Sequence, residues 1–78
     1  MIVTVNKLDF TARSAVREIL FDWMLECPED SRDAFETALN SGLRDKVHEE
    51  LETHYAGIGD VSFALEDDEL YTLYKSYA

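Results

Sequence analysis

The residues best suited to chemistry lie in one short stretch, His48 to His54, with the sequence HEELETH. Zinc hydrolases use HExxH, in which two histidines four residues apart on a helix bind the metal. Here Glu52 stands at the position of the second histidine, and the two histidines are six residues apart, on different sides of a helix. Either histidine with a glutamate four residues away supplies two ligands at most. We therefore expect no metal site.

The other reactive groups lack the neighbours that catalysis requires. Cys27 is the single cysteine and follows Trp23, Met24 and Leu25, a setting typical of a small buried residue. The three glycines match no phosphate-binding loop. Carboxylates are abundant, but acid–base catalysis needs a cleft that separates two pKa values, and so short a chain leaves little room for one. The sequence predicts neither an enzyme nor a cofactor.

Length and composition predict one compact domain over residues 1–78. The chain is 46% hydrophobic and 12% aromatic, which indicates a folded protein despite its net charge of −10. A single cysteine forms no internal disulfide, so the expected location is the cytoplasm. The first ten residues have neither a basic start nor a long apolar run, so we expect no signal peptide and no membrane span.

Negative charge is concentrated in the second half of the chain. Residues 1–46 hold six basic and nine acidic residues, whereas residues 47–78 hold one basic residue, Lys75, and eight acidic ones. Such a field repels nucleic acids and anionic membranes and favours basic partners. The alternative is that the charge serves solubility alone.

The N-terminal part predicts a strand followed by a long helix. Residues 1–6 contain four consecutive β-branched residues, which favour a strand. Thr11 is a suitable N-cap, and Phe10 is placed to pack on the first turn as a hydrophobic staple. Apolar residues at three- and four-residue steps then predict a helix over 11–27 with one buried face. They are Ala12, Ala15, Val16, Ile19, Leu20, Trp23 and Met24.

The opposite side of this helix carries Glu18, Asp22 and Glu26, each four residues after the last. This spacing makes a row of carboxylates that rises by roughly 6 Å per step. We interpret the row, called the acidic ridge below, as a solvated face and as a secondary candidate for partner binding.

The middle of the chain predicts two helices. Ser31 or Asp30 can cap the first of them. An apolar residue then recurs every four positions from Phe35 to Tyr55, a stripe that would drift by about 40° per step on a straight helix. A break at Gly42 relieves that drift, giving helices over about 31–40 and 42–56, with one bent helix as the alternative. Gly57 is expected to stop the second helix.

The last part predicts a second strand and a final element of either type. Residues 61–65 alternate as a half-buried strand does, and would pair with residues 1–6. The four acids from Glu66 to Glu69 then precede Leu70, Leu73, Tyr74 and Tyr77, which fit one helical face, although strand alternation also fits. We predict an α+β fold of three to four helices and an antiparallel sheet of two or three strands, in the order β-α-α-α-β-α or with a final β.

In its small size, acidity and lack of catalytic motifs the chain resembles the acidic inhibitors of phages and other mobile elements, including anti-CRISPR and anti-restriction proteins. The resemblance rests on size and charge and carries over no residue. It implies a nucleic-acid mimic whose carboxylates stand where phosphates would sit in a basic channel.

We therefore expect a non-enzymatic module that binds a basic surface of a nucleic-acid-binding protein. It would bind neither nucleic acid nor membrane directly. The alternative is an accessory interaction domain, with a homodimer as an option, that uses an apolar helix surface. The expected partner-binding surface combines acids with aromatic anchors. Its residues are Glu49, Glu50, Glu52, Asp60, Glu66, Asp67, Asp68, Glu69, Tyr71 and Tyr74.

Overall fold

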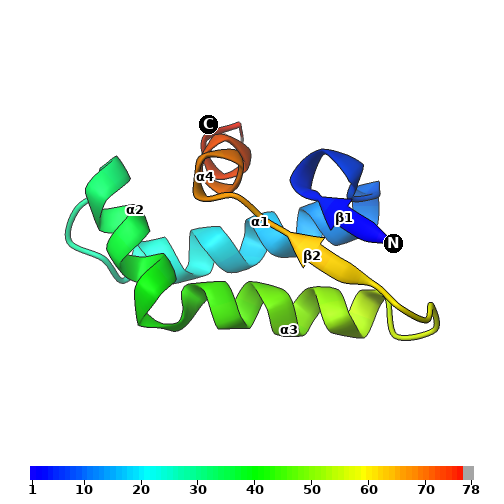
Figure 1. Cartoon of the computed structure of the whole chain (residues 1–78). Helices are drawn as coiled ribbons and strands as arrows, with labels where there is room; N and C mark the ends of the chain where they lie inside the picture. Colours follow the sequence, from blue (N-terminus) through cyan, green and yellow to red (C-terminus); the bar gives the residue numbers. More distant parts are fainter. Residues whose placement is uncertain (77–78) are drawn as a thin grey trace.

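The computed structural model describes residues 1–76, which form an α+β fold that is mostly helical (Figure 1). The elements follow the order β-α-α-α-β-α that was predicted from the sequence, and the final element is a helix rather than a strand. The prediction that placed Tyr77 on this helix lies outside the described residues. The elements are β1 (Ile2–Thr4), η1 (Val5–Lys7, a 3-10 turn), α1 (Phe10–Leu25), α2 (Arg32–Ala38), η2 (Leu39–Leu43, the kinked junction between α2 and α3), α3 (Arg44–His54), β2 (Ser62–Ala64) and α4 (Asp67–Lys75).

The sheet is parallel, so the predicted antiparallel pairing is wrong. β1 pairs with β2 in the register Val3 to Phe63, and the Ser62 amide donates to the Met1 carbonyl at 2.8 Å. A parallel pair needs a long crossover between its strands, and here η1, α1, α2 and α3 together supply it. Alternation of side chains identifies a strand but says nothing of its direction.

Helix α1 begins one residue earlier and ends two residues earlier than the range of 11–27 predicted from the sequence. Its N-cap is Asp9, whose Oδ1 accepts from the Ala12 amide at 2.8 Å, and not Thr11. Phe10 is consequently the first helical residue and is 83% exposed, so it is no hydrophobic staple. The predicted apolar face is confirmed at Ala12, Val16, Leu20 and Met24, which are buried.

The break between α2 and α3 lies at Gly42, as its position in the apolar repeat predicted. Gly42 has a φ of +129°, which L-residues rarely adopt. A Cβ there would also stand 3.3 Å from Cη2 of Trp23 on α1. The Ser31 hydroxyl caps α2 by accepting from the Ala34 amide at 3.1 Å. The helices are shorter than expected, since α2 spans 32–38 and α3 spans 44–54.

Gly42→Ala is therefore expected to destabilise the protein by about 1–3 kcal/mol, because the methyl group imposes backbone strain and crowds Trp23. The urea midpoint, followed by the fluorescence of this single tryptophan, measures the loss. Gly57→Ala is the matched control, since a Cβ there meets nothing within 4 Å. Equal stability of the two variants would contradict the described turn.

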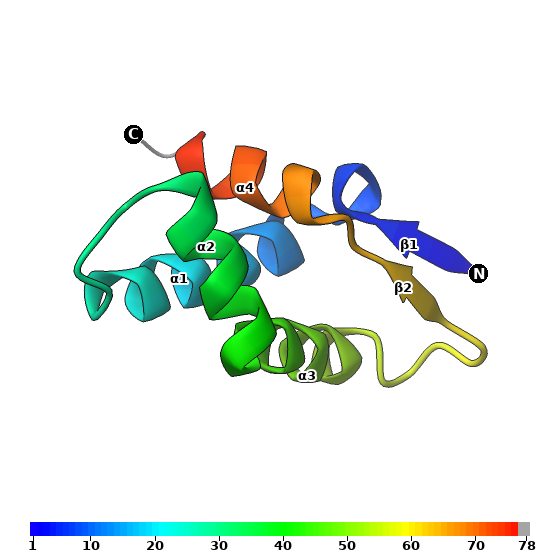
Figure 2. The same cartoon turned by 60° about the vertical axis from the view of Figure 1, so that its left-hand side comes forward.

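The core is formed where α2, α3 and α4 pack around α1. Figures 1 and 2 show α1 and α3 running in opposite directions, with α4 across α1 and the sheet at the end remote from α2. Phe35 of α2 contacts the rings of Tyr71 and Tyr74 of α4, with centroids 5.2 and 5.5 Å apart. The largest fully buried side chains are Phe35, Leu20, Leu39, Leu43, Leu51, Leu70, Val16 and Val47.

Candidate functional site

The acidic run at the start of α4 forms ion pairs within the molecule. Arg44 of α3 donates to both carboxylate oxygens of Asp67, at 2.5 and 3.2 Å. Arg32 of α2 donates to Asp68 at 2.7 Å. The guanidinium of Arg44 lowers the pKa of Asp67 through these hydrogen bonds. Two of the acids predicted to meet a partner therefore attach α4 to α2 and α3.

Asp67→Asn is expected to weaken the acid sensitivity of folding. Because its pKa is lowered from 3.8, Asp67 stabilises the native state above that ordinary value, and this contribution is lost as the pH falls through the lower folded pKa. Urea midpoints between about pH 5 and pH 2 should thus fall less steeply in the variant. Glu66→Gln removes a carboxylate without a partner among residues 1–76 and should leave the slope unchanged. If the urea midpoints of Asp67→Asn and of the wild type fall equally steeply with pH, Asp67 does not contribute to the acid sensitivity of folding.

The two predicted aromatic anchors also contact the body of the protein. Tyr74 is 7% exposed, and its hydroxyl donates to Asp30 at 2.8 Å. Burial, with Asp30 beside it, raises the pKa of Tyr74 to about 12. Tyr71 is half-buried, with Arg32 and Lys75 each 5.6 Å from its ring centre. Tyr74 is consequently a core residue, and Tyr71 is partly covered by cations of this chain.

The remaining acids of the predicted surface have different neighbours. Glu69 accepts from the Asn6 amide at 3.3 Å, and Glu50 lies 3.3 Å from Nε2 of His54. Glu49 and Glu66 are exposed, and their carboxylates form no hydrogen bond or ion pair with the residues described. These four acids do not converge on one pocket.

Glu52 and Asp60, in contrast, line one open hollow of about 300 Å³. It lies where the end of α3, the following loop and β2 meet, at the end of the molecule that carries the sheet (Figure 2). Tyr55 and Phe63, with ring centres 5.8 Å apart, are both half-buried and form part of its wall. The full lining is Glu52, Tyr55, Ala56, Ile58, Asp60, Val61 and Phe63.

The acidic ridge of α1 is exposed along its whole length. The carboxylates of Glu18, Asp22 and Glu26 make no hydrogen bond or ion pair with other residues of the described part. Asp22 and Glu26 line a groove of about 240 Å³ together with Ile19 and Trp23 of α1 and one cation, Lys46 of α3.

Trp23 also borders a second groove, of about 300 Å³, on its other side. Cys27 and Pro28 line it, with Glu29 as its acidic residue and α2 as the far wall. Leu25 nearby in sequence is 78% exposed. Cys27 is half-buried, and its thiol lies 3.8 Å from the Trp23 carbonyl. The end of α1 thus combines acidic residues with the apolar ring of Trp23, and tryptophan is enriched at binding hot spots.

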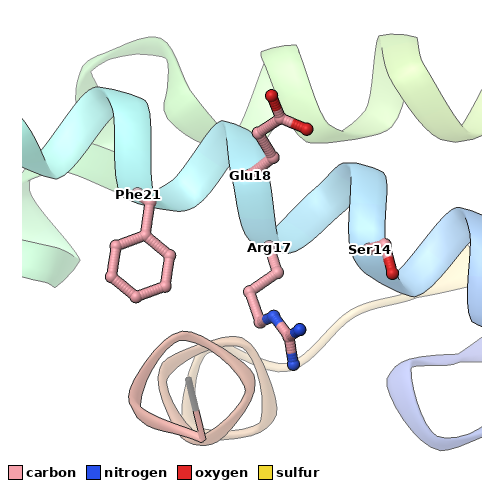
Figure 3. Close-up of a pocket in the computed structure, with 4 residues that line it drawn as sticks. All are labelled: Ser14, Arg17, Glu18 and Phe21. Carbon is pink, nitrogen blue, oxygen red and sulfur yellow. The ribbon is translucent and has the colours of Figure 1, made fainter. Parts of the chain in front are cut away.

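A further pocket, which sequence reasoning missed, lies on α1 beside α4. It has a volume of about 360 Å³ and is lined by Ser14, Arg17, Glu18 and Phe21. Figure 3 shows Arg17 and Phe21 extending toward α4, whereas the carboxylate of Glu18 extends to the opposite side of α1. Arg17 and Phe21 are four residues apart, which places them on one face of α1, and this spacing was the sign of the pocket in the sequence. A basic and an apolar side chain on one helical face do not indicate any particular ligand.

The described residues contain no group of three or more His, Cys, Asp or Glu side chains that could hold a metal ion. The rings of His48 and Phe63 are nearly perpendicular, with their centroids 6.0 Å apart. Among the same residues, no helix has the length and apolar character to cross a membrane. Comparisons with protein family models, with curated proteins and with solved structures found no match to this chain.

Proposed function

We propose that this protein is a non-enzymatic acidic module that binds a basic surface of a nucleic-acid-binding protein in the cytoplasm, in the manner of a nucleic-acid mimic. As an inhibitor of the anti-CRISPR or anti-restriction type, it would occupy a channel that otherwise holds nucleic acid. Its carboxylates would take the positions of phosphates.

The observation that carries this proposal is the acidic ridge. Its three carboxylates are exposed and without partners in residues 1–76, whereas Asp67 and Asp68 already pair with arginines. Two of the three also line a groove with Trp23, whose ring would add apolar contact. The favoured surface thus moves from the C-terminal acids to α1.

Affinity capture with the intact protein, followed by mass identification, tests the proposal. We expect a nucleic-acid-handling protein to be retained at low ionic strength and released as salt rises, because exposed charge pairs are screened. Excess duplex DNA or RNA should prevent the capture, because this protein and the nucleic acid would occupy the same basic site on the partner. A capture that yields no nucleic-acid-handling protein, or one that salt leaves unchanged, would overturn it.

The second candidate is a homodimer formed through an apolar helix surface. It is favoured by the exposure of Phe10 and Leu25 at the two ends of α1. Sedimentation separates the candidates: a dimer that persists at low and high salt supports the homodimer, and a monomer supports the acidic module.

A further inference from the structure

The hollow lined by Glu52 and Asp60 has the chemical character of a site for an organic cation. Both carboxylates are exposed and accept no hydrogen bond from the residues described. No lysine or arginine lines the hollow. The N-terminal ammonium, a cation next to Asp60, donates at 2.7 Å to the Asp60 backbone carbonyl and forms no ion pair with the Asp60 carboxylate.

The lining favours a guanidinium over a metal ion. Two carboxylates fall short of the oxygen ligands that a hard cation requires, and the described part of the chain holds no metal-binding group of three acids, histidines or cysteines. Tyr55 and Phe63 offer aromatic surface, on which a planar guanidinium stacks better than an ammonium does. The Tyr55 hydroxyl has no hydrogen-bond partner within residues 1–76 and can accept one of the five guanidinium N–H donors.

The site is held in place before any ligand arrives. Phe63 belongs to β2, is paired with Val3 of β1, and packs on both Tyr55 and His48. Asp60 closes the loop with a φ of +51°, and the N-terminal amine fixes its carbonyl. A volume of about 300 Å³ is at the lower limit for small-molecule sites, which suits one side chain.

We propose that the Glu52–Asp60 hollow receives one arginine side chain from the basic surface of the partner. Its guanidinium donates to the two carboxylates, and its aliphatic part lies against the wall formed by Tyr55 and Phe63. The inference rests on the proposed function for the identity of the partner, but the hollow can be tested without the partner.

A titration of the isotope-labelled full chain with N-acetyl-arginine methylamide, at constant ionic strength, tests the site by NMR. We expect the amide signals of Gly57 and Gly59, in the loop beside the hollow, to shift, while that of Gly42 beside Trp23 stays in place. The citrulline analogue, which is neutral and of the same shape, should leave all three unchanged. Equal shifts with citrulline, equal affinity for the lysine analogue, or no shift at Gly57 and Gly59 would overturn the proposal.

Two variants connect these shifts to the carboxylates. Glu52→Gln and Asp60→Asn should each weaken binding of the arginine probe by about two- to five-fold, as expected for exposed charge pairs. Both positions are exposed, and asparagine tolerates a positive φ, so the fold is retained. Glu49→Gln is the control and should bind as the wild type does. Wild-type affinity in both variants would overturn the proposal.

The outcomes separate this inference from the proposed function. Arginine-specific shifts without capture of any basic partner would support the hollow and overturn the function. Salt-sensitive capture that Glu52→Gln and Asp60→Asn leave unchanged would support the function and overturn the role of the hollow.

Discussion

Phe35→Ala is expected to cost about 3–5 kcal/mol of folding free energy, which is most of the stability of a domain this small. The Phe35 ring is fully buried and packs on Tyr71 and Tyr74, so its removal leaves a cavity between α2 and α4. The Asp68–Arg32 pair joins the same two helices, and an exposed pair of this kind cannot compensate for the loss.

Thermal unfolding measures this effect. The midpoint should fall by at least about 12 °C, because each kcal/mol shifts it by about 4–8 °C in a domain of this length. Phe10→Ala is the matched control, since that ring is 83% exposed and its loss should change stability by no more than about 0.5 kcal/mol. A loss below about 1 kcal/mol for Phe35→Ala would mean that α4 does not pack on α2 as described.

Neutralising the acidic ridge, with Glu18→Gln, Asp22→Asn and Glu26→Gln combined, should weaken partner binding by between about three-fold and about 150-fold. Each exposed charge pair contributes about 0.2–1 kcal/mol, and three pairs add up. Folding should respond in the opposite direction. Like charges four residues apart destabilise a helix, so the variant should gain about 0.2–0.5 kcal/mol for each of the two repulsive pairs removed.

A second triple variant separates ridge contacts from net charge. Asp33→Asn, Asp45→Asn and Glu66→Gln change the net charge by the same amount at positions that line neither groove beside Trp23. Calorimetry with the captured partner should show a much smaller loss of affinity for this control. An equal loss in both triple variants would show that α1 does not form the contact surface.

Features that depend on neighbouring residues could be predicted from the sequence. The apolar steps from Ala12 to Met24 identify the buried face of α1, and the four-residue repeat requires the break found at Gly42. Asp9 and Thr11 are both good N-caps, and the apolar steps do not choose between them. In the structure Asp9 is the N-cap, so the helix begins at Phe10 rather than after Thr11, and the Phe10 ring is exposed.

Features that depend on distant residues could not be predicted. The direction of β2 relative to β1 is determined by the path of three helices between them. Arg44 and Asp67 are 23 residues apart, so the acidic run of α4 appeared unopposed in the sequence although arginines meet it in space. The hollow depends in the same way on the loop that brings Asp60 back to Glu52.

The most direct test of the central claim is the affinity of the purified protein for its captured partner, measured against salt and against nucleic acid. If the protein binds as an acidic mimic, the affinity should fall by about ten-fold or more between about 50 and about 200 mM salt. Nucleic acid should then displace the protein competitively. An affinity that is independent of salt, or a ternary complex containing protein, partner and nucleic acid at once, would contradict the claim.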